Sequence, residues 1–367
     1  MKVLFLSNIP APYRIDFFNA LGKHCELTVV FEAKRAEGIR FNWNEDTVKS
    51  FRAVFLNEGE IDETHVDRRM MALVKRGEYD YIVATSYGYY TETAAILKMR
   101  LLGIPYLIEI DGGVVRAREN RLKYALKRCI IRGAGRLLSS GEATDAVFLH
   151  YGADAARIRR YPFTSLFDAD ILPAVPGAEE KNRERAALHI AEGRVVLSVG
   201  QFIRRKGYDV LLNHAGGLAD GTRLLLIGGE PTDEYRAILT KKGLTNVTFL
   251  PFCDKETLNR YYRAADVFVL PTREDMWGLV VNEAMANGLP VVTTENCNAG
   301  RELIRDGENG YLVPVEDGDT LIRRTNEILL DEERRGRMAK SALTTARAYT
   351  IEAMVRTHLA VFREDRD

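Results

Sequence analysis

The sequence predicts an α/β protein made of two Rossmann-like domains, each built on a doubly wound parallel sheet. The chain has 367 residues, enough for two or three domains of ordinary size. With 46% hydrophobic and 28% charged residues, its composition is that of a globular protein. Short apolar runs alternate with helix-like stretches, as they do in parallel sheets. The runs are continuously apolar, so we expect both faces of each sheet to be covered.

The first half of the chain contains six such runs. We predict strands within segments 2–9, 26–33, 51–56, 79–86, 105–111 and 136–141. Helix-like stretches lie around 65–76, 89–102 and 118–134. The pattern then lapses into a stretch with two prolines and a glycine, which is typical of a linker with one short helix.

A second series begins at residue 194. We predict strands within 194–202, 223–230, 247–252, 266–272, 290–294 and 309–315. Helices are predicted within 206–216, 233–243, 254–265 and 278–288, and after residue 315 to the end. The predicted division is an N-terminal domain at 1–168, a linker at 169–193, a C-terminal domain at 194–345 and a final helical segment at 346–367. Ligands of such sheets bind beyond the carboxyl ends of the strands, which predicts a cleft between two facing domains.

Composition argues against several classes of protein. Fifty-two basic residues balance 52 acidic ones, so no overall charge recruits nucleic acid. The four cysteines and six histidines show neither paired nor clustered spacing, which argues against disulfides and against a metal site. No run approaches 18 apolar residues, and the first residues lack a secretory pattern. We therefore expect a cytoplasmic location.

The segment PTREDMWGLVVNEAMANGLPVV, at 271–292, contains the first candidate site. A helix is expected to begin near Gly278, where unpaired amides and the helix dipole attract a phosphate. Glu283, further along this helix, can then reach a ribose, and Asp275 lies on the loop before it. The alternative is a solvated helix face for Glu283 and a helix cap for Asp275. Trp277 is expected to anchor the loop in the core.

The stretch SVGQFIRRKGYDVLL, at 198–212, places a glycine turn after a strand and Lys206 at the start of a helix. A cation at that point is well placed to meet phosphate. Together with FLPF, AADVFVLPT and the segment 271–292, this stretch resembles glycosyltransferase family 4, whose members are retaining enzymes of the GT-B fold. The family's signature is two glutamates separated by seven residues, and Asp275 and Glu283 occupy those places over a resemblance of about 110 residues.

The resemblance implies a donor site. Glu283 would bind the ribose, the amides of Gly278, Leu279 and Val280 the diphosphate, and Asp275 the hydroxyls of the transferred sugar. Lys206 would bind the diphosphate.

Two positions depart from the family pattern in this half. Asp275 is one methylene shorter than glutamate, so Glu274 beside it is a substitute candidate. Gln201 replaces the arginine expected after Gly200, and the missing charge falls to Arg204 or Arg205, unless these two form only a solvated turn.

The acceptor side of the predicted cleft is less clearly marked. Where similar enzymes often have a histidine, this chain has Asp111, followed by Gly112, which allows a ligand close to the backbone. An acid there can accept a hydrogen bond from a sugar hydroxyl, although a turn aspartate is an equal alternative. Tyr13 and Arg14, in the loop after the first strand, are further candidates.

A basic segment lies at 116–136, with eight cations and one acid, a local charge of +7. Five residues share one face of its predicted helix: Leu122, Ala125, Leu126, Cys129 and Ile130. Such a helix can lie on an anionic membrane surface, or it can pack and present a solvated basic face.

The predicted function is that of a retaining transferase that moves a sugar from a nucleotide-diphosphate sugar, UDP-linked in the commonest case, to a glycan or lipid-linked acceptor in cell-surface polysaccharide biosynthesis. No cofactor, metal or nucleic acid is expected. Asp275, Asp111 and Glu274 are the candidate catalytic residues, in positioning roles. The alternatives are a nucleotide-sugar epimerase, an inactive scaffold and a two-lobed solute-binding protein. The final helix is expected to return to the N-terminal domain.

Overall fold

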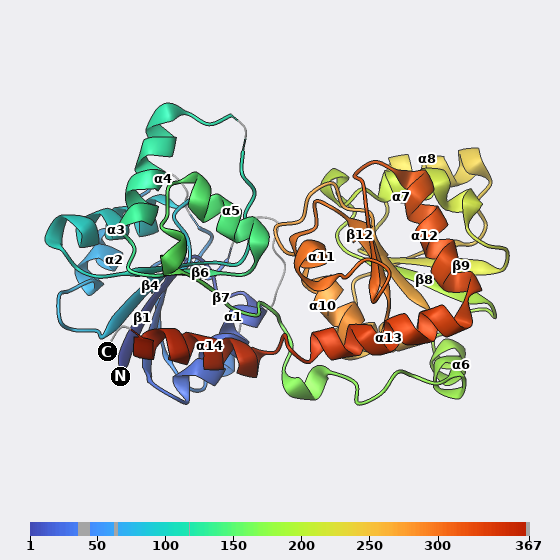
Figure 1. The fold of residues 1–367 in the computed structure, drawn as a ribbon, viewed down its shortest axis with the longest axis horizontal. Helices are drawn as coiled ribbons and strands as arrows, with labels where there is room; N and C mark the ends of the chain where they lie inside the picture. The colour runs from blue at the N-terminus through green and yellow to red at the C-terminus, as the bar shows by residue number, and fades with distance from the viewer. Residues whose placement is uncertain (36–44, 62–64, 117, 365–367) are drawn as a thin grey trace. The chain divides into compact units, whose positions relative to one another are not determined.

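The computed structural model describes residues 1–35, 45–61, 65–116 and 118–364. The chain forms two compact units. Unit 1 comprises residues 1–165 and 350–367, and unit 2 comprises residues 166–349. The chain therefore passes from one unit to the other twice (Figure 1).

Unit 1 contains a seven-stranded sheet in the order β3-β2-β1-β4-β5-β6-β7, and all neighbouring strands are parallel. The strands are β1 (Lys2–Ser7), β2 (Glu26–Phe31), β3 (Arg52–Phe55), β4 (Tyr81–Ala84), β5 (Leu107–Ile110), β6 (Leu137–Ser139) and β7 (Ile158–Arg160). The helices are α1 (Pro12–Gly22), α2 (Arg68–Leu73), α3 (Tyr90–Leu102), α4 (Arg121–Gly133), α5 (Glu142–His150) and α14 (Ile351–Glu364).

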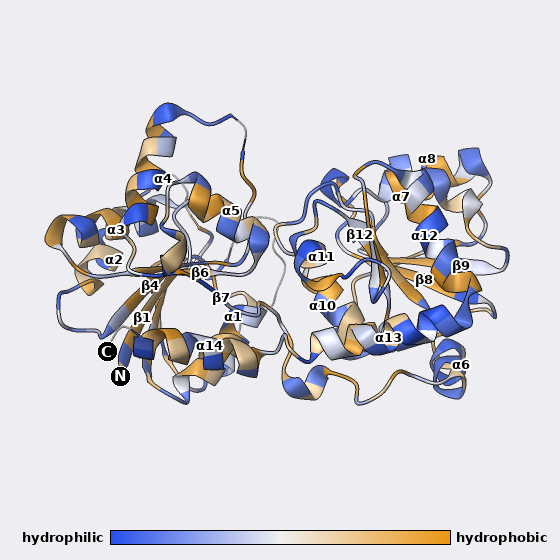
Figure 2. Cartoon of the chain, in the orientation of Figure 1, coloured by the Kyte–Doolittle hydropathy of each residue, from blue (hydrophilic) through white to orange (hydrophobic). Residues whose placement is uncertain are grey.

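Alternate residues of β1 serve the two faces of this sheet, as the pleat requires. Leu4 and Leu6 belong to the core cluster formed with α3, α4 and α5. Phe5 points to the opposite face, where its ring contacts Phe17 and Phe18 of α1. Helix α14 packs beside α1 on that face. The apolar strands are therefore enclosed by helices whose outer surfaces are largely hydrophilic (Figure 2).

Unit 2 contains a six-stranded sheet in the order β10-β9-β8-β11-β12-β13, again parallel throughout. The strands are β8 (Arg194–Val199), β9 (Thr222–Ile227), β10 (Val247–Leu250), β11 (Val267–Leu270), β12 (Val291–Thr294) and β13 (Gly310–Val313). The helices are α6 (Ala178–Ala187), α7 (Tyr208–His214), α8 (Asp233–Lys242), α9 (Lys255–Ala264), α10 (Leu279–Ala286), α11 (Asn298–Leu303), α12 (Gly318–Leu330) and α13 (Glu332–Ala346).

Each strand segment predicted from the sequence contains a strand, and the prediction of two parallel, Rossmann-like α/β units is confirmed. Among the described strands and α-helices, four were missed: β7, α1, α5 and α11 (Asn298–Leu303). Strand β7 has only three residues and two of them are arginines, so it lacks an apolar run. Helix α1 buries an arginine among its apolar residues, which blurs the amphipathic pattern.

The segment predicted as a linker, 169–193, lies within unit 2. Its helix α6 packs against α9. Lys181 Nζ donates to the carbonyl of Ala265 at 2.8 Å, and Arg185 Nη2 lies 2.8 Å from Asp266 Oδ2. This hydrogen bond and this ion pair join residues 84 and 81 positions apart, so a local pattern could not reveal them. At the other end of the chain, α14 lies in unit 1, while residues 365–367 of the predicted final segment fall outside the described part.

Candidate functional site

The start of α10 is held by a glycine in a conformation that other residues rarely adopt. Gly278 has φ +100°, and a Cβ there would lie 3.0 Å from Cys297 Sγ. The preceding residue, Trp277, is buried, and its ring nitrogen donates to Asn282 Oδ1 at 2.9 Å, which confirms its predicted role as an anchor. The first amides of a helix have no acceptor within the helix, so those of Leu279 and Val280 are available at this point.

The loops that follow the neighbouring strands β8 and β11 meet at Asp275. This carboxylate is buried and forms a hydrogen-bonded ion pair with Lys206. Arg205 contacts it more weakly, at 3.5 Å, and donates to the carbonyl of Glu274 at 2.8 Å. A Cβ on Gly207 would lie 2.1 Å from the carbonyl oxygen of the residue after β11, which shows how closely the two loops approach. Asp275 is 69 positions from Lys206 and 70 from Arg205 in the sequence, and the fold brings the three side chains together.

Glu283 lies in the second turn of α10 and is partly buried. The hydroxyl of Tyr262, on α9, donates to Glu283 Oε2 at 3.0 Å. Burial raises the pKa of Glu283, and the Tyr262 hydrogen bond opposes that shift. Tyr262 was not predicted as a site residue, because nothing in the sequence distinguishes this tyrosine from its neighbour in an ordinary amphipathic helix.

The remaining residues predicted for the donor side are spread around this point. The Gly200 carbonyl accepts from the hydroxyl of Tyr208 at 3.2 Å, and the side chains of Gln201 and Arg204 are exposed. Arg204 is not part of the ion pair with Asp275, although its carbonyl accepts from Arg273 at 2.7 Å.

The loops after β9 and β10 reach the same edge of the sheet. A Cβ on Gly228 would lie 2.0 Å from the Gly200 carbonyl, and one on Gly229 would lie 2.9 Å from the ring of Phe252. Phe252 is 62% exposed. The glycine pair after an apolar run was the sequence signal that could have predicted this close approach.

In unit 1, Asp111 accepts hydrogen bonds from three side chains. The donors are the Tyr13 hydroxyl at 2.9 Å, Arg14 Nη2 at 2.6 Å and the Tyr161 hydroxyl at 2.8 Å. Burial raises the pKa of Asp111, and the charge of Arg14 opposes the shift. Gly112, next to it, is buried.

Arg14 does not present its charge to solvent, as an acceptor-binding residue would. It is 4% exposed and also forms a buried ion pair with Glu109. Glu109, His358 and Tyr161 are thus further members of this cluster that the sequence analysis did not single out. A glutamate inside the apolar run LIEI was the available signal for one of them.

The chain resembles a known protein family over one segment and solved structures over its whole length. Residues 180–345 match the sequence model of the family described as Glycosyl transferases group 1. The matched segment is less than half of the chain. It includes all the residues gathered around α10, together with Lys206 and Arg205. The residues of the Asp111 cluster lie outside the segment.

Two curated relatives illustrate the similarity. D-inositol 3-phosphate glycosyltransferase of Acidothermus cellulolyticus is 32% identical over 257 residues, which cover 64% of this chain and 54% of the relative. The lipopolysaccharide core biosynthesis glycosyltransferase LpsE of Rhizobium meliloti is 34% identical over 152 residues, 41% of this chain and 44% of the relative. The chain thus spans about half the length of these glycosyltransferases.

Solved structures extend the similarity to the whole fold. The crystal structure of Anabaena HepE in complex with UDP has a TM-score of 0.80 at 16% identity, covering 99% of this chain and all of that one. A glycosyltransferase from Rickettsia africae has a TM-score of 0.78 at 13% identity, covering 99% and 98%. At such identities the likeness shows the fold alone, which is that of GT-B glycosyltransferases.

Two further observations bear on the predicted partners of this glycosyltransferase-like chain. In the described ranges, no three or more His, Cys, Asp or Glu side chains gather where they could bind a metal ion. Among the described helices, none is long and apolar enough to cross a bilayer.

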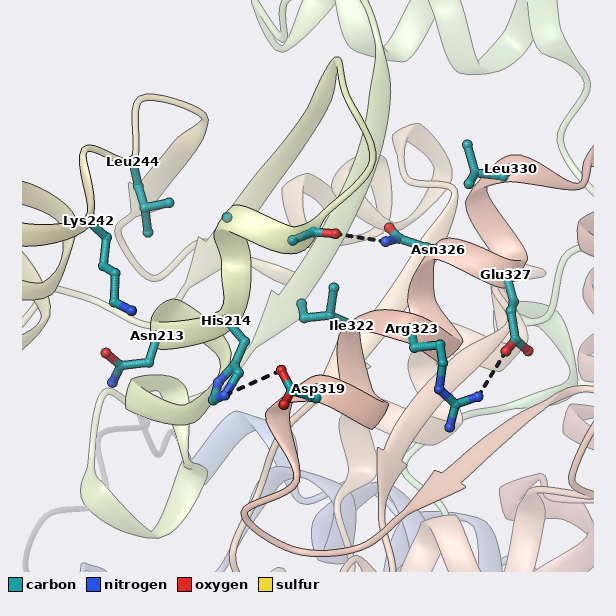
Figure 3. Close-up of a pocket in the computed structure, with 12 residues that line it drawn as sticks. Asn213, His214, Lys242, Leu244, Asp319, Ile322, Arg323, Asn326, Glu327 and Leu330 are labelled. Carbon is teal, nitrogen blue, oxygen red and sulfur yellow. Dashed lines mark hydrogen bonds and ion pairs between the residues drawn. The ribbon is translucent and has the colours of Figure 1, made fainter.

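A cavity of about 690 Å³ lies elsewhere in unit 2, between α7, α8 and α12 (Figure 3). His214, Lys242, Asp319 and Arg323 are among its lining residues. None of the residues predicted for the donor site lines this cavity.

Proposed function

We propose that this protein is a retaining glycosyltransferase that moves a sugar from a nucleotide-diphosphate sugar to a glycan or a lipid-linked acceptor. One observation carries the proposal: Lys206, Arg205 and Asp275 meet beside Gly278, where α10 begins. Helix amides and two cations at one point suit a diphosphate. The group 1 family match over 180–345 supports the same conclusion.

The proposed donor site assigns a role to each group. The amides of Gly278, Leu279 and Val280 bind the diphosphate, assisted by Lys206 and Arg205. These fixed charges stabilise the departing nucleoside diphosphate without a metal or a cofactor. In this structure Lys206 is paired with Asp275. An incoming diphosphate therefore replaces the Asp275 carboxylate as the anion bound to Lys206.

Glu283 binds the ribose in this proposal. With Tyr262 donating to one of its carboxylate oxygens, the other oxygen can accept from a ribose hydroxyl. Asp275, freed from Lys206 by the diphosphate, then accepts hydrogen bonds from the sugar being transferred, with Glu274 as the substitute. Gly200 lets the chain approach the phosphates closely, and the exposed Gln201 and Arg204 border them.

Uridine is the nucleoside we propose for the donor. Structures of Anabaena HepE are described as complexes with UDP and with UDP-glucose, which supports this choice. For the acceptor, relatives are named for D-inositol 3-phosphate and for the lipopolysaccharide core. We accordingly propose a role in cell-surface polysaccharide or glycolipid biosynthesis, on the cytoplasmic side of the membrane.

The Asp111 cluster forms the proposed acceptor side. With three donors on its carboxylate, Asp111 is held in one orientation, which suits a positioning role. Tyr13 and Gly112 then border the acceptor, and Arg14 supports them from within. Retention is assigned to attack on the donor's front face, assisted by the leaving phosphate, and no protein nucleophile is proposed.

Helix α4 is the proposed membrane contact. Four of the five residues on its predicted apolar face are exposed, and Leu122 is 80% exposed. The fifth, Ile130, is buried. An exposed apolar stripe with cations around it is typical of helices that lie on anionic lipid.

A thermal-shift series with UDP, GDP, ADP and dTDP tests the donor site. A nucleotide at 100 times its Kd adds about 2.7 kcal/mol to the free energy of unfolding. We expect one nucleotide, UDP first, to raise the melting temperature. The effect should be lost in Glu283→Ala and kept in Glu333→Ala, which removes an exposed glutamate of α13. If no nucleotide stabilises the protein, the donor site is wrong and the inactive scaffold is favoured.

Incubation with the stabilising nucleotide's sugar alone separates a transferase from an epimerase. An epimerase converts the sugar without an acceptor, whereas a transferase releases it only by slow hydrolysis. Accumulation of an epimeric nucleotide sugar would contradict the proposed transfer.

A further inference from the structure

The helix that ends the described chain buries a histidine in the middle of unit 1. His358 on α14 is 0% exposed and lies among aromatic rings. Its ring centroid is 4.7 Å from that of Phe17, 5.1 Å from Tyr161 and 6.3 Å from Phe362. A histidine in such apolar surroundings is expected to satisfy both ring nitrogens.

Each nitrogen of this ring faces an acceptor. Nδ1 lies 2.8 Å from the carbonyl oxygen of Met354, and Nε2 lies 3.0 Å from Glu109 Oε2. A carbonyl oxygen cannot donate a proton. Burial by itself would raise the pKa of Glu109, but the charge of Arg14, with which it forms a buried ion pair, lowers it, so this carboxylate is ionised and also only accepts. Two acceptors require two N–H donors, so the imidazole carries both protons and a positive charge.

This assignment completes a chain of four alternating charges inside unit 1. His358 pairs with Glu109, Glu109 pairs with Arg14, and Arg14 pairs with Asp111. The links come from α14, β5, α1 and the residue just after β5, and the charges sum to zero. A buried charge is tolerated only when it is paired, so each member depends on its neighbours.

We infer that His358 is a positioning residue for the acceptor side: its positive charge holds Glu109, which leaves Arg14 free to fix Asp111. Without that charge, Arg14 is the one cation that the described part of the chain pairs with these two carboxylates, of which Glu109 is the more deeply buried. Arg14 then turns toward Glu109, and Asp111 keeps only its two tyrosine donors. The inference rests on the proposed function only in calling Asp111 the acceptor side.

The first test reads the ring directly in the full chain. In the NMR spectrum of histidine-labelled protein at neutral pH, we expect both ring nitrogens of His358 to carry a proton, identified by the loss of that signal in His358→Gln. A ring with one protonated nitrogen would overturn the charge assignment and the inference with it.

The second test measures hydrogen exchange of backbone amides. In His358→Gln we expect faster exchange in two segments far apart in sequence, α14 and residues 107–113, by roughly tenfold or more in each. His214→Gln is the matched control. His214 also places Nδ1 at 2.8 Å from the carbonyl four residues earlier, but its other nitrogen faces the exposed Asp319 at 3.8 Å (Figure 3). We expect this control to leave residues 107–113 unchanged.

A double variant separates charge from packing. Glu109→Gln removes the buried negative charge that His358 neutralises, so combining it with His358→Gln should restore slow exchange at 107–113. If the double variant does not restore slow exchange, or if His358→Gln speeds exchange in α14 alone, the positioning role is overturned and His358 acts only through packing. None of these readouts uses a nucleotide, so a failure here is distinct from a negative thermal-shift series, which concerns the proposed donor site.

Discussion

Buried carboxyl groups in unit 1 show how the surroundings of a side chain decide the direction of its pKa shift. Glu32, just after β2, is almost fully buried, and one of its oxygens accepts from the backbone amide of Glu92 at 3.0 Å. Glu92 is 0% exposed, and its pKa is raised well above the ordinary value by burial and by the nearby Glu32. Glu109, equally buried but paired with Arg14 and His358, has its pKa shifted in the opposite direction.

The first prediction concerns stability against pH. Burial raises the pKa of Glu32 from 4.5 to about 7. The folded state therefore keeps a proton that the unfolded state releases, so this contribution is complete below pH 4.5 and is lost as pH rises through about 7. We expect the free energy of unfolding to fall across this range, by at most about 3 kcal/mol.

Thermal unfolding followed by circular dichroism at pH 5 and pH 8 measures this loss. Glu32→Gln should flatten the dependence, while Glu26→Gln, at the more exposed start of the same strand, should not. Equal slopes for the wild type and Glu32→Gln would show that another group is responsible.

The second prediction is that substituting either partner of the Lys206–Asp275 ion pair changes UDP affinity, in opposite directions. Lys206→Gln removes a cation from the diphosphate and should weaken UDP binding by roughly ten- to a hundredfold. Asp275→Asn removes an anion that competes for Lys206, so it should strengthen UDP binding by roughly threefold or more while lowering transfer. Calorimetric titration measures both, with Lys242→Gln, on the 690 Å³ cavity, as the control. Weaker UDP binding in Asp275→Asn would contradict the competition.

At the scale of elements, the third prediction concerns the turn before α10 and its effect on stability and on UDP binding. Gly278→Ala forces a Cβ to 3.0 Å from Cys297 Sγ at φ +100° and should cost about 1–3 kcal/mol of stability. Because it displaces the first turn of the helix, it should also abolish stabilisation by UDP. Gly243→Ala is the matched control, since that glycine also has positive φ, at +62°, but nothing lies within 4 Å of its added Cβ.

Thermal unfolding with and without UDP distinguishes the two variants. Gly243→Ala is expected to lower the melting temperature while keeping the full shift with UDP. If Gly278→Ala keeps that shift as well, the start of α10 does not bind the diphosphate.

The fourth prediction concerns α4 and lipid. Exposed cations near an anionic surface contribute about 1 kcal/mol each, and the exposed leucines add apolar burial. We expect binding to vesicles that contain phosphatidylserine, little binding to phosphatidylcholine alone, and weakening as salt is added. Co-sedimentation measures this. Replacing Leu122 and Leu126 by glutamine should reduce binding, whereas the same change at Leu101 and Leu102, also exposed but on α3, should not.

At the scale of the whole molecule, the chain passes from unit 1 to unit 2 and back, so the core of unit 1 is built from two separate parts of the sequence. The last helix follows α13 of unit 2 but belongs to the core of unit 1, where the Phe362 ring stacks on Tyr81 with centroids 4.8 Å apart. The Tyr81 hydroxyl also donates to the Phe362 carbonyl. The core of unit 1 therefore requires α14, which lies more than 180 positions after the rest of that unit.

The fifth prediction is that removing residues 350–367 disrupts unit 1 and spares unit 2. The truncation uncovers aromatic side chains of α1 and leaves Glu109 with one cation, so unit 1 should lose protection from hydrogen exchange. Unit 2 keeps its own core and should still be stabilised by UDP. Unchanged exchange in β1, β4 and β5 would show that α14 contributes little to unit 1.

Local sequence was sufficient for the strands and for several residues of the proposed donor site. Continuous apolar runs reveal strands because burial on both faces leaves no room for polar residues, and only the short, arginine-containing β7 escaped. The turn before α10 was also visible, because a glycine between an apolar strand and an apolar helical pattern is typical of a tight turn into a helix. The pairing of Asp275 with Lys206 and Arg205 was not visible, since it depends on how two loops meet.

The sequence alone determined the two parallel α/β units, the start of α10 and the residues available for a phosphate site, because each of these depends on neighbours within a few positions. Only the tertiary structure decided that the supposed linker packs on unit 2, that Arg14 is buried and that His358 joins Glu109. Those features depend on charges brought together from positions 80 to 250 residues apart. A buried charge is stabilised by the partner that the fold places beside it, and the local sequence pattern does not identify that partner.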